Sequence, residues 1–204
     1  ITVIGEAAVG GLVGENNGGT IRNARVFGDV TSTRGAVGGL AATNSGVIQN
    51  VETSGDVTDV DPTDAPSSTF VGGIVGVAES NSTIQNATSS SNVKGSTVDR
   101  GGNKVGGLVG QNSGVIRETF AAGSVSRGAD STIGGLVGDN EDPLSDAGTI
   151  EDSYFDKQKT GQATSAGSAT PLTTTEMQGQ AATENMRFDF DNTWTTTSEY
   201  PALR

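Results

Sequence analysis

The sequence predicts an all-β protein: a parallel β-solenoid (β-helix) of about five three-stranded rungs, with a small C-terminal cap that contains a short helix. Three observations lead to this fold class. A glycine-rich motif recurs five times along the chain, and its Gly-Gly pairs and β-branched neighbours disfavour helices. The repeat then stops before a segment that holds most of the aromatic rings.

Three anchor positions define the repeat. The first is an aliphatic residue followed by Gly-Gly and a second aliphatic residue, beginning at Val9, Val37, Val71, Val105 and Ile133. The second is an isoleucine, at Ile21, Ile48, Ile84, Ile116 and Ile150, and the third is a valine, at Val30, Val57, Val93 and Val125. The third anchor follows the second by nine residues every time, whereas the other two intervals vary. One interval of constant length and two of variable length indicate stacked strands with loop insertions.

Polar residues also recur at fixed positions around the isoleucine. Four residues before it, turn-forming side chains are expected at Asn17, Asn44, Ser80, Asn112 and Asp146. Two residues after it stand Asn23, Asn50 and Asn86, then Glu118 and Asp152, and the asparagines are expected to stack as a ladder. The residues directly after the isoleucine should line one outer face, which is either an ordinary solvated surface or a ligand groove: Arg22, Gln49, Gln85 and Arg117.

Composition excludes several classes of function. A net charge of −12 and a pI near 4.2 argue against a nucleic-acid partner, which requires a basic surface. Without cysteine or histidine, the chain has no disulfides, thiolate or imidazole metal ligands, or histidine catalysis. No apolar run is long enough to span a membrane.

The first residues, "ITVIGEAAVGG", have the pattern of the middle of a repeat. We therefore expect a processed product or a fragment, with residues 1–4 forming the last strand of an earlier rung.

The repeat motifs and the C-terminal segment resemble those of a known protein family. The "GGLVG" cores, with the "NSGVI" and "GSV" pieces that follow them, resemble GLUG-motif repeats, which occur in large secreted or surface-anchored proteins, many of them adhesins of the filamentous-haemagglutinin type. The stretches "SYFDKQKTGQATSAGSATPLTTTEMQ" and "FDFDNTWTTTSEYPALR" resemble the segment that closes such arrays. The second repeat departs from the pattern, with Ala41-Ala42 in place of Val-Gly. The resemblance implies a β-helical surface protein in adhesion or matrix building, with no catalytic residues to carry over.

The repeat predicts two regions: GLUG-type solenoid repeats over residues 1–160 and a C-terminal capping segment over 161–204. Lys159 occupies the position where the next third-anchor valine would fall, so the periodicity has ended there. Thr173 with Glu176 three residues later is a helix-start signature. The aromatic residues of this segment are expected to pack the cap, with a carbohydrate-binding platform as the alternative.

Two acidic stretches are candidate Ca²⁺ sites, because calcium is bound by several carboxylate and carbonyl oxygens. The candidate ligands are Asp56, Asp59, Asp61 and Asp64 in one stretch, and Asp139, Glu141 and Asp142 in the other. Neither stretch has the spacing of an EF-hand or of the nonapeptide calcium repeat, and the composition favours solvated acidic loops over calcium sites. Asn81 and Asn86 match the glycosylation acceptor pattern, although Asn86 also belongs to the asparagine column.

Together these features predict a non-catalytic extracellular surface protein, an adhesin or structural stalk, whose partners are surface glycans or another cell-surface protein. The loops after Val57 and Val93 and before Ile150 vary in length, so they are the expected binding elements. A first alternative is a filament or viral tail-fibre subunit that self-associates end to end through its uncapped N-terminal edge. A second is a polysaccharide-acting β-helix enzyme. No cofactor other than Ca²⁺ is expected.

Overall fold

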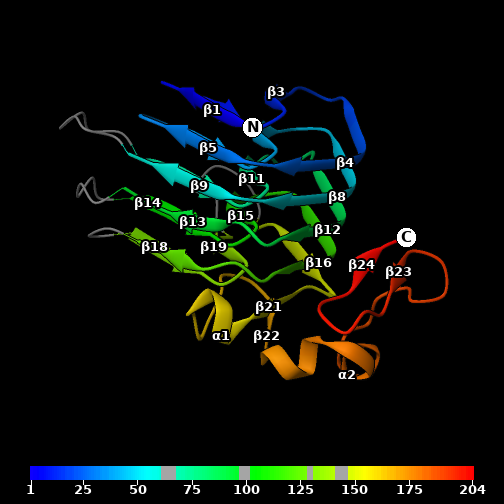
Figure 1. The fold of residues 1–204 in the computed structure, drawn as a ribbon. Coiled ribbons are helices and arrows are strands. Elements are labelled where there is room, and N and C mark those ends of the chain that lie inside the picture. The colour runs from blue at the N-terminus through cyan, green and yellow to red at the C-terminus, as the bar shows by residue number, and fades with distance from the viewer. Residues whose placement is uncertain (61–67, 97–101, 128–130, 141–146) are drawn as a thin grey trace.

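The computed structural model describes residues 1–60, 68–96, 102–127, 131–140 and 147–204. Within them the chain winds into stacked coils whose strands pair in parallel with the equivalent strands of the coils above and below (Figure 1). Four coils are complete, and a fifth, incomplete one leads into the C-terminal cap. The predicted parallel β-solenoid is therefore confirmed.

Four parallel sheets form the sides of the solenoid. Sheet A contains β1 (Thr2–Gly5), β5 (Asp29–Ser32), β9 (Asp56–Asp59), β13 (Asn92–Lys94) and β17 (Val125–Ser126). Sheet B contains β2 (Val9–Gly10), β6 (Ala36–Gly38), β10 (Phe70–Gly72), β14 (Asn103–Gly106) and β18 (Ser131–Gly134). Sheet C contains β3 (Val13–Asn16), β7 (Ala41–Asn44), β11 (Val75–Ala78), β15 (Val109–Asn112) and β19 (Val137–Asp139). Sheet D contains β4 (Thr20–Phe27), β8 (Val47–Ser54), β12 (Thr83–Ser89), β16 (Val115–Ala121), β20 (Thr149–Glu151), β21 (Tyr154–Asp156) and β22 (Thr170–Leu172).

Each complete coil contributes one strand to each of sheets B, C, D and A in turn. A coil therefore has four strands, and the prediction of three strands per rung is wrong by one. The first anchor, expected to form a single strand, is divided by a sharp bend at its Gly-Gly pair. A Cβ atom on Gly38 would lie 2.0 Å from the carbonyl oxygen of Ala41, and one on Gly39 would lie 2.2 Å from that of Gly73 in the next coil. Only glycine fits at a corner where the backbone approaches itself this closely.

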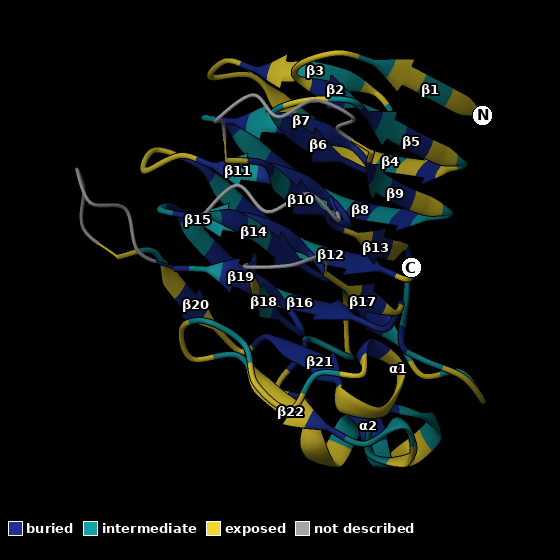
Figure 2. Cartoon of the chain, turned by 90° about the vertical axis from the view of Figure 1, so that its left-hand side faces the viewer, coloured by how far each residue is buried: buried dark blue, intermediate teal, exposed yellow. Residues whose placement is uncertain are grey.

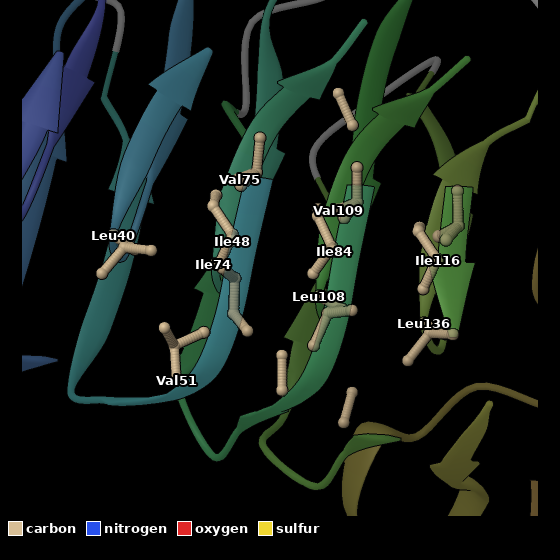
Figure 3. Packing of buried hydrophobic residues seen from close by; sticks show 14 of the residues in the cluster. Leu40, Ile48, Val51, Ile74, Val75, Ile84, Leu108, Val109, Ile116 and Leu136 are labelled. Atoms are coloured by element: carbon tan, nitrogen blue, oxygen red, sulfur yellow. The ribbon is translucent and has the colours of Figure 1, made fainter. Parts of the chain in front are cut away.

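The core consists of columns of identical or similar residues, one from each coil (Figure 3). Parallel pairing places Ile84 opposite both Ile48 and Ile116, so the second anchors stack in register. The first-anchor valines pair in the same way in sheet B and pack against the third-anchor valines in a second cluster. Complete burial of each such aliphatic side chain stabilises the fold by about 1.5–3 kcal/mol, and most of that burial depends on the neighbouring coil.

The first coil lacks this cover on one side. Leu12 is 52% exposed, whereas its equivalent in the next coil, Leu40, is fully buried. Phe27 of this coil is also exposed, as is Ile4 in β1, the strand that precedes it. Strand β1 pairs with β5 with Val3 opposite Val30, so β1 occupies a third-anchor position, as expected from the sequence.

The asparagine column of sheet D forms the predicted ladder. Asn86 donates from Nδ2 to Oδ1 of Asn50, and Asn50 donates in turn to Asn23, each over 3.1 Å. The backbone at all three residues is left-handed, with φ between 51° and 55°. Asparagine tolerates this conformation better than most residues, so one residue type meets both requirements.

A second amide ladder is buried at the bend between sheets C and D. Asn16 donates to Asn44 over 2.7 Å, and Asn112 donates to Asn140 over 2.8 Å. In the third coil this position belongs to Ala78, which pairs with both Asn44 and Asn112, so the ladder is interrupted there. The sequence placed Asn17 and Ser80 in this column, which is wrong because the bends of the first and third coils are longer, and Asn16 and Ala78 take these positions.

The C-terminal part closes one end of the solenoid with α1 (Lys157–Thr160), η1 (Thr174–Met177), α2 (Gly179–Asn185) and the antiparallel pair β23 (Trp194–Thr195) and β24 (Ala202–Leu203). Parallel pairing continues across residue 160, since β22 pairs with β21. Thr173 and Glu176 form the predicted capping box at the start of η1. The cap has its own buried core beneath the last coil (Figure 2).

Asp156 ties the cap to the solenoid. Its carboxylate accepts hydrogen bonds from the Thr174 hydroxyl, the Tyr200 hydroxyl and two N–H groups at the start of α1. Burial alone would raise the pKa of Asp156, but these four hydrogen bonds outweigh it and hold the pKa below its ordinary value. Burial, and then the bond to Asp156, raise the pKa of Tyr200.

Candidate ligand-binding face

The outer side of sheet D carries three ladders of side chains parallel to the solenoid axis. We call this surface the polar face; its members are Thr20, Arg22, Asn23, Val47, Gln49, Asn50, Thr83, Gln85, Asn86, Val115, Arg117 and Glu118. Pairing places Gln49 beside both Arg22 and Gln85, and Arg117 beside Gln85. The residues after each isoleucine therefore line one outer face, as predicted. Successive members are about 4.8 Å apart along the axis, the spacing of hydrogen-bonded strands.

Hydrogen bonds hold the middle of the polar face in a fixed arrangement. Arg117 donates from Nε to Oε1 of Gln85 over 2.8 Å, and the asparagine ladder runs beside this pair. Amide groups locked in this way present free donors and acceptors at a regular spacing, with little rotamer entropy left to lose on binding. The surface is therefore suited to a repetitive polar ligand.

The variable segments differ from this face in the strands that they connect. Residues 61–67, 97–101 and 128–130 each connect a strand of sheet A to a strand of sheet B, and 141–146 connect sheet C to sheet D. The nine-residue interval of constant length, from the second-anchor isoleucine to the third-anchor valine, instead runs from sheet D into sheet A. The predicted binding loops fall in these segments and lie outside the described residues, so binding by them stays a prediction.

The C-terminal segment packs along one margin of sheet D. A neighbouring column of outward side chains contains Arg25, Glu52, Thr88, Phe120 and Tyr154, and it becomes more buried toward the cap. Tyr200 stacks on Phe120 with ring centroids 5.8 Å apart. Farther from the cap, Arg25 and Glu52 form an ion pair over 3.2 Å. The seam between sheet D and β24 is therefore apolar near the cap and polar beyond it.

Two hollows follow this seam. The first is lined in part by Glu52, Thr88, Tyr200 and Leu203. The second, of about 210 Å³, lies between the asparagine ladder and β24 and is lined by Asn23, Arg25, Asn50, Leu203 and Arg204. We call the second hollow the seam groove. Sequence reasoning missed it because no periodic signal indicates where the C-terminal segment lies.

The described candidate calcium ligands are not brought together. Asp56 accepts a hydrogen bond from Asn92 on the outside of sheet A, and Asp59 is buried at the other end of the same strand. Asp139 forms an ion pair with Lys104 over 2.8 Å in a different part of the solenoid. Asp61, Asp64, Glu141 and Asp142 lie outside the described residues. Among the described residues, no three acidic side chains are grouped so that they could hold a metal ion.

The two glycosylation motifs differ in environment. Asn81 is exposed in the turn after β11, whereas Asn86 is half-buried and its amide donates to Asn50. Modification of either residue stays a prediction.

The rings of the C-terminal segment pack against one another. Phe188 stacks on Trp194 with centroids 4.6 Å apart, and Tyr154 contacts Phe188 edge-on. Trp194, Phe188 and Tyr154 are buried in the cap core, so they pack the cap as predicted and form no carbohydrate-binding platform. Phe155 is also buried, but it packs in the core of the solenoid.

The comparisons with known proteins agree with the repeat. A family model described as "The GLUG motif" matches residues 5–31, which span most of the first coil. The chain carries the GLUG motif. The later coils place the same anchors in register with this one, so the resemblance inferred from the sequence is confirmed.

Two much longer proteins are related to part of the chain. The chain is 35% identical over 129 residues to a candidate Gly-rich membrane protein of Evansella cellulosilytica, and 46% identical over 89 residues to the halomucin of Haloquadratum walsbyi. These alignments cover 62% and 43% of the chain but only 14% and 1% of the relatives, which are far longer. Among the described residues, no helix is both long and apolar enough to cross a bilayer.

A solved structure has the same fold. The crystal structure of a candidate immunoglobulin A1 protease from Bacteroides ovatus superimposes on all of the chain and 75% of that protein, with a TM-score of 0.65 and 19% identity. At this identity the likeness concerns the fold alone.

Proposed function

We propose that this GLUG-repeat chain is a non-catalytic part of an extracellular or cell-surface protein, an adhesin or structural stalk, and that its polar face binds glycans. The observation that carries the proposal is the regular array of amide and guanidinium groups on sheet D. Its spacing of about 4.8 Å is comparable to the length of one pyranose residue in an extended polysaccharide. Each coil can therefore offer one set of hydrogen-bonding groups to one sugar.

The comparisons support the surface location. The resemblance to GLUG repeats implies a secreted or surface-anchored protein, and the two relatives are described as a Gly-rich membrane protein and a halomucin. A rigid solenoid is suited to holding a face at a distance from its attachment point, because each coil contacts only its neighbours and the array extends without a change of core.

Structural roles of the acidic groups support the non-catalytic part of the proposal. Asp156 is engaged by four hydrogen bonds, and Asp56 and Asp139 pair with Asn92 and Lys104. The Asp156 carboxylate fastens the cap, and a group held by that many donors is a poor general base. Incubation with the bound glycan should release no new reducing or unsaturated ends. Appearance of such ends would favour the alternative of a polysaccharide-acting enzyme.

The experiment that tests glycan binding is a co-sedimentation or array assay with purified chain and a panel of extended polysaccharides. Replacing Gln49 and Gln85 together by alanine should reduce binding at least tenfold, because it removes the central column of the polar face. A double replacement of Thr31 and Thr58 on the outside of sheet A is the matched control and should bind normally. Equal binding by both variants would contradict the assignment of the ligand to sheet D.

A further inference from the structure

We infer that the seam groove is an anion-binding subsite, and that the glycan bound by the polar face is an acidic polysaccharide whose carboxylate enters this groove. The inference rests on the proposed function and names the class of its ligand. It is carried by three features of the described residues: the direction of the asparagine ladder, the cations beside its end, and the hollow in which they meet.

The ladder has a direction. Each amide donates toward the first coil, from Asn86 to Asn50 and from Asn50 to Asn23. Asn23 thus accepts a bond, while its own Nδ2 group has no partner among the described residues. A chain of hydrogen bonds polarises its members, so the free N–H groups at its donor end attract an acceptor more strongly than those of an isolated amide. The acceptor favoured most at such an end is an anion.

Two arginines stand at the same end. Arg25 and Arg204 both line the seam groove with Asn23. Arg25 uses Nε for Glu52, and Arg204 uses Nε and Nη2 for the carbonyl oxygens of Trp194 and Phe190. Each guanidinium retains further N–H groups, because arginine carries five. Their existing contacts hold the two side chains in place, which lowers the entropy lost on binding an anion.

The cations beside the groove act over a short range, whereas the negative charge is distributed over the whole molecule. The chain has a net charge of −12, which on its own would repel an anionic polymer. At physiological ionic strength, however, interactions between exposed charges are screened beyond about 8 Å. Within that range the groove contains Arg25 and Arg204, and Arg22 is the neighbour of Asn23 on the same strand. Glu52 of the adjoining hollow pairs with Arg25 and offsets its charge, so Arg22 and Arg204 supply the remaining positive charge at this end of the ladder.

The position of the groove relates it to the polar face. Asn23 and Asn50 belong to both surfaces, so a ligand on sheet D can reach the groove without leaving the face. Leu203 provides an apolar wall opposite the amides. An amide and guanidinium wall facing an apolar wall suits a sugar that carries a carboxylate, because the ring has apolar C–H faces and the substituent is charged.

Titration calorimetry with the full chain tests the inference, with trigalacturonate as the acidic probe, maltotriose as the neutral one and sodium sulfate as the inorganic one. Arg25→Gln and Asn23→Asp should each weaken trigalacturonate binding at least tenfold, and binding should weaken as salt increases. Arg34→Gln removes a cation from an exposed turn away from the face and should bind as the parent chain does. Thermal unfolding of each variant establishes that it is folded.

Three outcomes would overturn the inference. Equal loss with Arg25→Gln and Arg34→Gln would mean that only net charge matters. Maltotriose binding as tightly as trigalacturonate would remove the need for an anion site while leaving glycan binding by the polar face intact. Displacement of trigalacturonate by an equal concentration of sulfate would assign the groove to inorganic anions. If no saccharide in the panel binds even the parent chain, the proposed function itself fails.

Discussion

The Nδ2 group of Asn50 lies 3.1 Å from Oδ1 of Asn23, and both residues have left-handed backbone. The same position in the next coils is held by Asn86, Glu118 and Asp152, all with positive φ. The bend in sheet D is thus repeated in every coil, but the amide ladder extends only as far as Asn86. At Glu118 the fourth coil retains the left-handed backbone without the amide hydrogen bond that accompanies it in the first three coils.

Glu118→Asn should therefore stabilise the protein. The new amide would donate to Oδ1 of Asn86, which accepts no hydrogen bond from the residues that the structure describes, a gain of about 1 kcal/mol for a typical hydrogen bond. It would also reduce the left-handed strain, which costs most residues about 1–2 kcal/mol. Chemical denaturation measures the change. Glu118→Gln is the control, because it supplies an amide but keeps a side chain less suited to positive φ. If both variants have the stability of the parent, the ladder contributes nothing.

The interruption of the buried ladder allows a second prediction. Ala78→Asn would place an amide between Asn44 and Asn112, with which residue 78 already pairs. We expect a gain of about 1 kcal/mol in the free energy of unfolding, since both neighbours have unused hydrogen-bonding capacity. Ala78→Leu introduces the same number of side-chain heavy atoms in a bulkier side chain without an amide, and should destabilise the core by about 1–3 kcal/mol through overpacking. A loss of stability with asparagine as large as that with leucine would show that the site has no room for the ladder.

The pH dependence of stability should report on Asp156. Its folded-state pKa is lowered, so its contribution is complete above the unfolded-state pKa of about 3.9 and is lost as pH falls toward the folded value. Asp156→Asn should lower the unfolding temperature at pH 7 and weaken the decline on acidification. Asp191→Asn, an exposed site in the same cap, should leave both unchanged. An acid decline as steep in Asp156→Asn as in the parent would assign the effect to other groups.

Much of the solenoid can be predicted from the sequence because each coil contacts only the coils before and after it. Ile48 pairs with Ile84 and Ile84 with Ile116, so the spacing of the repeat is enough to align them. Other features could not be read in this way. Counting back from Ile21 selects Asn17 instead of Asn16, because bend length varies between coils. The seam groove brings Arg204 beside Asn23 through packing of a non-repeating segment, for which periodicity carries no information.

The recurrence of Gly-Gly leads to the last prediction. Gly39→Ala should destabilise the solenoid severely, by roughly 3 kcal/mol or more, because the added methyl group would meet the carbonyl oxygen of Gly73 at 2.2 Å. That oxygen belongs to the backbone of the next coil, so the clash is relieved only by separating two coils whose strands are hydrogen-bonded. Gly14→Ala is the matched control: its Cβ would meet a single atom, at 3.0 Å, and the loss should be about 1 kcal/mol or less. Urea unfolding followed by far-ultraviolet circular dichroism compares the two variants. Equal, small losses would mean that the coils separate easily, and the close approach of backbones at the corner would then not be the reason for the glycine pair.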